Sequence, residues 1–188
     1  MSDSLITKKA IAQALKDICR EKAFDKISIA DITTACGLNR QTFYYHFQDK
    51  YELLSWIYYN ENFGRITEDI SFANWDKRFL EMLNIMESDK SFYINTLKEQ
   101  EHTFESYLFD MAKALFLEAI EALDKNHKLK DEEKEFDAEF YAYGICGVIL
   151  SWAEKGMKIP PSQVALRLKR LAQDSEKAAY MRSLESTG

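Results

Sequence analysis

Apolar residues recur every three to four positions along most of the 188-residue chain, a spacing that is typical of α-helices. We expect a first helix over about 7–22 and two short helices beginning near Ser28 and Asn39. Longer helices are expected over about 49–64, 75–87, 91–98, 104–123, 133–155 and 162–181, with loops at 125–131 and 158–161. The chain contains only six Gly and two Pro, which favours an all-α fold with short connections.

The first 50 residues contain two short predicted helices joined by a tight turn. Ser28 can cap the first of them, and Asp31 three positions later completes the pattern of a capping box. Gly37 is placed to end that helix in the left-handed conformation, and Asn39 is placed to cap the next helix. Two short helices around a turn that contains glycine form the layout of a helix-turn-helix motif.

The helix after Asn39 carries side chains suited to nucleic acid. Phe43 and Phe47, four residues apart, are expected to form its buried side. Long polar and aromatic side chains project away from that side: Arg40, Gln41, Tyr44, Tyr45 and Gln48. Arg and Gln can each bind a base edge with two hydrogen bonds, and each such pair contributes about 1–3 kcal/mol of discrimination. The pattern therefore favours a helix that reads bases in a DNA groove.

Charge is distributed unevenly, although this is weaker support for DNA binding. Residues 1–50 contain eight Lys or Arg and six Asp or Glu, a net charge of +2, whereas the whole chain has a net charge of −6. The remaining residues therefore carry a net charge of −8. A mildly basic segment of an acidic protein can bind DNA locally while the acidic part stays away from the phosphates.

No pattern in the sequence indicates catalysis, a metal or a cofactor. We find no paired carboxylates on a buried face, no nucleophile elbow and no phosphate-binding glycine loop, so an enzyme is set aside. His102 and His127 lack metal-ligand spacing. The three cysteines are interpreted as small buried groups in a reducing cytosol: Cys19, Cys36 and Cys146. Without an apolar signal region or an apolar stretch of about 18 residues, we expect a cytoplasmic protein with no membrane partner.

The stretch IADITTACGLNRQTFYYHFQDKYELL, residues 29–54, resembles the DNA-binding signature of the TetR family of transcription regulators. The resemblance implies an N-terminal three-helix helix-turn-helix DNA-binding domain, residues 1–52. It also implies a C-terminal helical regulatory and dimerisation domain, residues 53–188. We call these two parts the head and the body.

The resemblance also implies which residues bind operator DNA. Those expected at or near base edges are Arg40, Gln41 and Thr42. Those expected to face the DNA backbone and the groove walls are Tyr44, Tyr45 and His46. Lys50 is expected to contact a phosphate. Ser28 is the remaining residue expected at the interface with DNA. Two alternatives stay open, because the Thr42 hydroxyl can instead cap the local backbone and His46 can simply pack beside Phe47.

A second informative segment is FYAYGICGVILSWAEKGMKIPPSQV, residues 140–164, which is apolar nearly all round the helix that it predicts. Gly144 and Gly147 each cost about 1 kcal/mol of helix propensity relative to Ala, and close approach of another backbone would explain this cost. We interpret this helix and the one after the Pro pair as half of a four-helix homodimer interface, which also resembles the dimerisation helices of the TetR family. The residues expected there are Tyr143, Gly144, Gly147, Leu150, Ser151 and Leu166. The alternative is a core helix of a single chain.

A twofold dimer would present two recognition helices to a near-palindromic operator. The two half-sites would lie a whole number of helical turns apart, each turn being about 34–36 Å. A DNA-binding segment with a net charge of only +2 over residues 1–50 must work in duplicate to reach useful affinity.

Within the TetR family, the chain most resembles the DhaS-type regulators of dihydroxyacetone kinase operons, on the head together with the stretch GICGVILSWAEKGMKIPP. This resemblance implies an activator whose effector is a protein, a kinase-subunit-like co-activator carrying dihydroxyacetone. Ten body side chains could instead line a ligand pocket or anchor a docked protein, although such residues at helical spacing more often form a core: Trp75, Phe79, Met82, Met86, Phe92, Tyr93, Phe104, Tyr107, Met111 and Phe116. Two other functions stay open, a repressor released by a small apolar ligand and a helical ligand-binding or adaptor protein without a DNA role.

Overall fold

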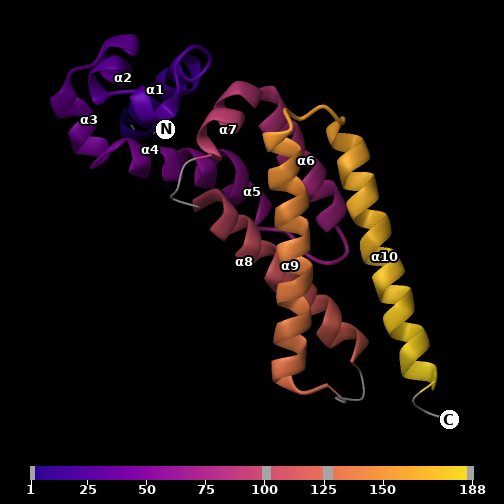
Figure 1. Ribbon diagram of the computed structural model, residues 1–188. Coiled ribbons are helices and arrows are strands. Elements are labelled where there is room, and N and C mark those ends of the chain that lie inside the picture. Colours follow the sequence, from indigo (N-terminus) through magenta and orange to yellow (C-terminus); the bar gives the residue numbers. More distant parts are fainter. Residues whose placement is uncertain (1–2, 99–102, 125–128, 186–188) are drawn as a thin grey trace.

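The computed structural model describes residues 3–98, 103–124 and 129–185, and every regular element in these ranges is a helix, which confirms the predicted all-α fold (Figure 1). The head contains α1 (Asp3–Ile18), the 3-10 helix η1 (Phe24–Lys26), α2 (Ile29–Ala35) and α3 (Arg40–His46). From the head into the body run α4 (Lys50–Ile57), the π-helical turn η2 (Tyr58–Phe63) and α5 (Gly64–Ile66). The body continues with α6 (Trp75–Ser88), α7 (Lys90–Thr96), α8 (Thr103–Leu123), α9 (Asp131–Glu154) and α10 (Pro161–Glu185).

The first helix and the helix that links head and body differ clearly from the prediction. The first helix ends at Ile18, four residues earlier than expected, because the chain tightens into turns in which the Glu21 N–H donates to the Ile18 carbonyl at 3.1 Å. The helix expected over 49–64 is interrupted by η2, a π-helical turn, which is rare and often marks a functional segment. Apolar spacing alone does not reveal such a turn, because it displaces the pattern by a single residue.

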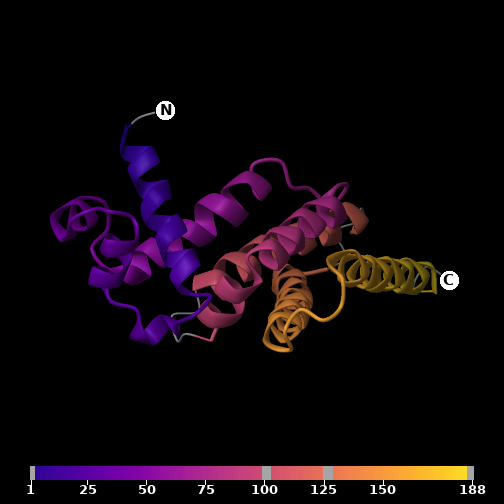
Figure 2. The ribbon, with the colours of Figure 1, turned by 90° about the horizontal axis from the view of Figure 1, so that it is seen from above.

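The head and the two C-terminal helices lie at opposite ends of the molecule. Figures 1 and 2 show α1, α2 and α3 at one end and α9 and α10 at the other. Within the body, α8 packs against α9, whereas α10 packs against α6. The two last helices are therefore attached to the body through different neighbours.

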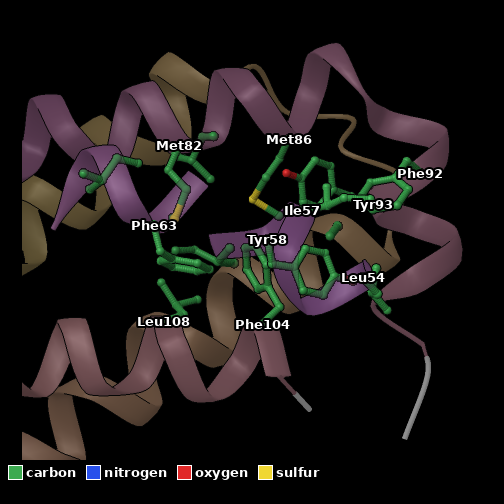
Figure 3. Close-up of a cluster of buried hydrophobic side chains, with 14 of the residues drawn as sticks. Leu54, Ile57, Tyr58, Phe63, Met82, Met86, Phe92, Tyr93, Phe104 and Leu108 are labelled. Carbon is green, nitrogen blue, oxygen red and sulfur yellow. The ribbon is translucent and has the colours of Figure 1, made fainter. Parts of the chain in front are cut away.

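A cluster of aromatic side chains fills the body next to the head, and Tyr58 lies at its centre (Figure 3). The Tyr58 ring stacks on Tyr93 with centroids 6.0 Å apart and meets Phe104 edge-on at 5.2 Å. Its hydroxyl donates to the Thr96 hydroxyl at 2.7 Å, so its polar end is satisfied inside the core. This cluster joins α4, η2, α6, α7 and α8 into one packed unit.

The ten body side chains singled out from the sequence belong to this core. Tyr107 and Phe116 are partly buried, and the other eight are buried, so the expectation that some serve as exposed docking anchors is wrong for those eight. A cavity between α6, α8 and α9 has a volume of about 10 Å³ and is lined in part by Trp75, Phe79 and Phe116. Such a volume holds one water molecule at most. Around this cavity, the described side chains pack against one another.

One buried polar atom in this core has no partner among the described residues. Asn62, in η2, is fully buried, and its Nδ2 donates to the Tyr93 hydroxyl at 2.8 Å. Its Oδ1 accepts no hydrogen bond within the described part of the chain. The same burial raises the pKa of Tyr93 well above its ordinary value, and the nearby charge of Glu61 adds to the effect. The π-helical turn therefore carries an unsatisfied amide oxygen into an apolar environment.

Candidate DNA-binding interface

The start of α2 is fixed by the capping box that the sequence predicts. The Ser28 Oγ accepts from the Asp31 N–H at 3.2 Å, and the Ser28 N–H and hydroxyl both donate to Asp31 Oδ2 at 2.8 Å. Lys22 adds an ion pair to the same carboxylate at 2.7 Å. The pKa of Asp31 is lowered well below its usual range by the hydrogen bond from Lys22 and then by those from Ser28.

The turn between α2 and α3 has the predicted geometry. Gly37 adopts φ +69°, a left-handed conformation that L side chains rarely adopt. The Leu38 N–H donates to the Thr33 carbonyl at 2.9 Å, which closes the end of α2. Asn39 then caps α3, its Oδ1 accepting from the backbone N–H of Thr42 at 2.8 Å and from the Thr42 hydroxyl at 3.0 Å. The Thr42 hydroxyl therefore takes part in the local cap.

The helix α3 has one face in the core and one face toward solvent. Phe43 and Phe47 are buried, as predicted from their spacing, and Phe47 meets Trp56 of α4 edge-on at 5.9 Å. The opposite face is exposed and carries Arg40, Gln41, Tyr44 and Tyr45, the two tyrosines being 56% and 83% exposed. An exposed aromatic side chain on a helix whose core face is complete is available for a partner surface.

His46 occupies the edge between these two faces. Its side chain is half-buried, and its ring meets Tyr45 edge-on at 5.0 Å and lies 6.5 Å from the ring of Phe47. The packing beside Phe47 that the sequence left open is thus present. The exposed part of the ring still adjoins Tyr45 on the solvent face.

Lys50 has a different environment from the one expected. Its ammonium donates to the carbonyls of Phe24, Asp25 and Ile27 at 2.8, 3.1 and 3.0 Å, and it lies 4.7 Å from the centroid of the Phe24 ring. An ammonium has three protons, and these three bonds use all of them. Lys50 therefore closes the turn around η1, and its contact with a phosphate stays a prediction. Sequence spacing could not reveal these hydrogen bonds, because the carbonyls lie 23 to 26 residues earlier.

The residues expected at a dimer interface lie along the outer face of the body. Tyr143 and Leu166 are 64% and 47% exposed, Gly144 and Gly147 are exposed, and Leu150 and Ser151 are half-buried. A Cβ added at Gly144 or Gly147 would meet nothing within 4 Å, so packing within the chain does not explain these glycines.

We expected α9 to be buried on more than one side, but in the single chain only one of its sides is buried. Its inner side, including Ala142, Ile145 and Ile149, is buried. Its outer side exposes Phe140 and Val148 to 68% and 44%. Apolar side chains thus line both sides of α9, and those on the outer side stay largely exposed, although the Tyr143 ring lies 4.6 Å from that of Phe109.

The described residues show no arrangement for metal binding or nucleophilic chemistry. Burial raises the pKa of both Cys19 and Cys146 to about 12, so these thiols stay protonated at neutral pH. Among the residues that the structure describes, no three His, Cys, Asp or Glu side chains gather to hold a metal ion. None of the described helices is sufficiently long and apolar to span a membrane. His102 and His127 lie outside the described residues.

Comparisons with known proteins cover both halves of the chain. Residues 11–56 match the family described as "Bacterial regulatory proteins, tetR family", and residues 73–174 match the family described as "Transcriptional regulator C-terminal region". A curated relative is the "HTH-type dhaKLM operon transcriptional activator DhaS" of Lactococcus lactis subsp. lactis (strain IL1403). It is 31% identical over 150 residues, which cover 79% of this chain and 80% of the relative.

Solved structures show the same relationship. The "Dihydroxyacetone kinase operon activator DhaS" superposes with a TM-score of 0.73 at 28% identity, covering 93% of this chain and 98% of that one. The fatty acid degradation regulator FadR from Bacillus halodurans has a TM-score of 0.59 at 13% identity, covering 88% and 93% of the two chains. At this lower identity only the fold is shared.

A capped helix-turn-helix with an exposed polar and aromatic face, joined to an all-helical body, defines a DNA-binding transcription regulator. This chain belongs to the TetR family. It is therefore a regulator and not an enzyme.

The environment of Lys50 leads to a prediction. Lys50→Met should lower the free energy of unfolding by about 1–3 kcal/mol, because three backbone carbonyls lose their donor, two of them partly buried. The slope of log affinity against log salt concentration should stay unchanged, since no phosphate contact is lost. Urea unfolding and DNA binding at several salt concentrations measure the two quantities. Lys26→Met removes the same charge from an exposed side chain of η1 and serves as the control. Normal stability together with a slope reduced by about one would show instead that Lys50 contacts a phosphate.

Proposed function

We propose that this protein is a homodimeric activator of a dihydroxyacetone kinase operon that works with a kinase-subunit-like co-activator protein. The observation that carries this proposal is the similarity to DhaS through both head and body. The identity is 31% over 150 residues, and the structural match covers 93% of the chain. Similarity confined to the head would support a likeness in DNA binding alone. Similarity in the body supports a likeness in how DNA binding is controlled.

In this proposal the exposed side of α3 enters the major groove of the operator. Arg40 and Gln41 lie at the start of the helix and are exposed, so their long side chains reach base edges. Tyr44 and Tyr45 face the sugar-phosphate backbone, and His46 lies at the groove wall. Ser28 and Thr42 act mainly through the caps that hold α2 and α3. In this proposal Lys50 does not contact a phosphate, because its three protons bind backbone carbonyls.

The base-reading role predicts a loss of sequence preference. Arg40→Ala and Gln41→Ala should each weaken operator binding by roughly tenfold or more, while binding to random DNA changes far less. Fluorescence anisotropy with operator and scrambled duplexes at one salt concentration measures the ratio. Lys77→Ala removes the same charge from an exposed position of α6, outside the head and the proposed dimer interface, and should leave the ratio unchanged. Equal losses on both duplexes would contradict base reading.

The dimer is proposed on the outer side of α9 and on α10. Exposed apolar groups there include Tyr143, Val148 and Leu166. Gly144 and Gly147 lie on the same helix as Tyr143 and Val148, and a Cβ added at either glycine would meet open space. Each glycine costs about 1 kcal/mol of helix propensity, and nothing within the described chain recovers that cost. Close approach of the same helix from a second copy would recover it by burying apolar surface. The pair would then hold two heads facing one near-palindromic operator.

Gly147→Leu separates the stability of the single chain from that of the dimer. Within one chain a Leu side chain meets nothing and favours the helix by up to about 1 kcal/mol relative to Gly, so the monomer should not be destabilised. In the dimer the same side chain should force the helices apart and raise the dissociation constant by roughly a hundredfold or more. Sedimentation equilibrium measures this change. Ala114→Leu adds apolar volume at an exposed position of α8 and should leave dimerisation unchanged. A Gly147→Leu protein that stays dimeric would contradict this interface.

A protein effector is favoured over a small apolar ligand by the packing of the body. Eight of the ten side chains that could line a pocket are buried against one another. The cavity beside Trp75 and Phe79 has a volume of about 10 Å³, whereas pockets for drug-sized ligands measure about 300–1,000 Å³. No observation favours a repressor released by a small apolar ligand. Family membership leaves no support for a ligand carrier or adaptor without a DNA role.

The two kinds of effector are distinguished by titration. Dihydroxyacetone alone should leave the affinity for operator DNA and the in vitro transcription of the kinase genes unchanged. The dihydroxyacetone-binding kinase subunit, loaded with its ligand, should increase transcription from the same template. The Arg40→Ala/Gln41→Ala protein is the control, because a regulator that does not read the operator should not respond. Release from DNA by dihydroxyacetone alone would contradict a protein effector.

A further inference from the structure

Asn95 of the body binds the backbone of the head. It lies on α7, which packs against α1 beside the head (Figure 1). Its Nδ2 donates to the carbonyls of Cys19 and Lys22 at 3.0 and 2.8 Å, and its Oδ1 accepts from the Phe24 N–H at 2.9 Å. One amide side chain thus satisfies three backbone groups between the end of α1 and the start of η1. Backbone groups at helix ends otherwise lack partners.

Lys16 makes a second connection, in the opposite direction. It lies on α1, is only 8% exposed, and its ammonium contacts Glu61 at 2.7 Å and Asp89 at 3.0 Å. Glu61 belongs to the π-helical turn η2, and Asp89 precedes α7. Burial alone would lower the pKa of Lys16, but the hydrogen bonds and charges of the two carboxylates outweigh burial and raise it. Lys16 therefore stays charged and held between two carboxylates.

The two connections together fix the angle between the head and the body. Asp89 and Asn95 lie at opposite ends of α7, so α1 is held to the body at two separate points. Apolar contacts tolerate sliding, because the hydrophobic effect has no direction. Hydrogen bonds weaken steeply when their angles change, and charge-assisted ones are the strongest. The polar contacts therefore resist a rotation of the head that the apolar core alone would permit.

We propose that Asn95 and Lys16 are positioning residues for operator recognition, which set the angle of each head on its body and so the spacing of half-sites that the dimer accepts. This inference rests on the proposed dimer. Neither residue belongs to the DNA-contacting set, and neither has a sequence pattern that marks it. In B-DNA one additional base pair moves a half-site by about 3.4 Å and turns it by about one-tenth of a helical turn. A rigid pair of heads cannot follow such a change without distorting the DNA.

The test is the spacing preference of variants that lack the connection. Operators are selected from random duplexes by the wild-type protein, and their spacer is then lengthened or shortened by one base pair. The wild-type protein should lose roughly tenfold or more in affinity for each changed spacer, because the DNA must twist or bend. Asn95→Asp, which loses both N–H donors, and Lys16→Met should lose less than about threefold. Asn95→Ala repeats the test without a new charge.

A matched control separates positioning from stability. Ile32→Val removes a methylene from the buried core of the head and should destabilise it by about as much as a lost polar contact. It leaves Asn95 and Lys16 in place, so its spacing preference should match that of the wild-type protein. A purely structural role for Asn95 would lower the affinity for all spacers alike, as in the control, and that result would overturn the proposal.

Sedimentation of the same samples distinguishes this inference from the proposed function. A wild-type protein that is dimeric but accepts all spacers would overturn the role of Asn95 and Lys16 alone. A wild-type protein that sediments as a monomer on and off the operator would overturn the proposed dimer, and this inference with it. A dimer whose variants keep the narrow preference of the wild-type protein would also overturn the positioning role.

Discussion

The helices α2, α3 and α4 are only seven or eight residues long, and helices of that length are unstable alone in water. Besides their buried sides, they depend on side chains that satisfy the free backbone groups at their ends. Ser28, Asn39 and Asp49 do this for the three N-termini. Lys50 and Asn95 do it for the turns around η1. The surface proposed to meet DNA is therefore held in place by hydrogen bonds at helix ends as well as by its small core.

The long helix α9 has the opposite character. It has 24 residues, it is buried on one side against the body, and it exposes aromatic residues and glycines on the other. Phe140 and Tyr143 are 68% and 64% exposed in the single chain, although apolar burial is the main driving force of association. The head thus uses polar groups to hold a fixed shape, whereas the outer side of α9 presents apolar surface for association. The proposed dimer on paired half-sites needs both properties.

The sequence predicted those features of the fold whose partners lie within one helical turn. The caps of Ser28 and Asn39 involve backbone groups three residues away, so local spacing was sufficient. Lys50 and Asn95 bind groups 23 to 76 residues away, and no local pattern could reveal them. The aromatic residues of the body have the same spacing in a core as beside a pocket, so only packing could separate the two. Which residues touch operator bases stays a prediction.

Asn62 has a consequence for the region where head and body meet. Burying an amide oxygen without a donor costs about 1–3 kcal/mol, and this atom lies one residue from Glu61, which binds Lys16. The folded state with Asn62 therefore has a higher free energy than it would have with an apolar side chain of equal size at this position. Any rearrangement that brings a hydroxyl group or a water molecule to this oxygen recovers that energy. A polar acceptor is thus placed inside the core next to the joint through which the body holds the head.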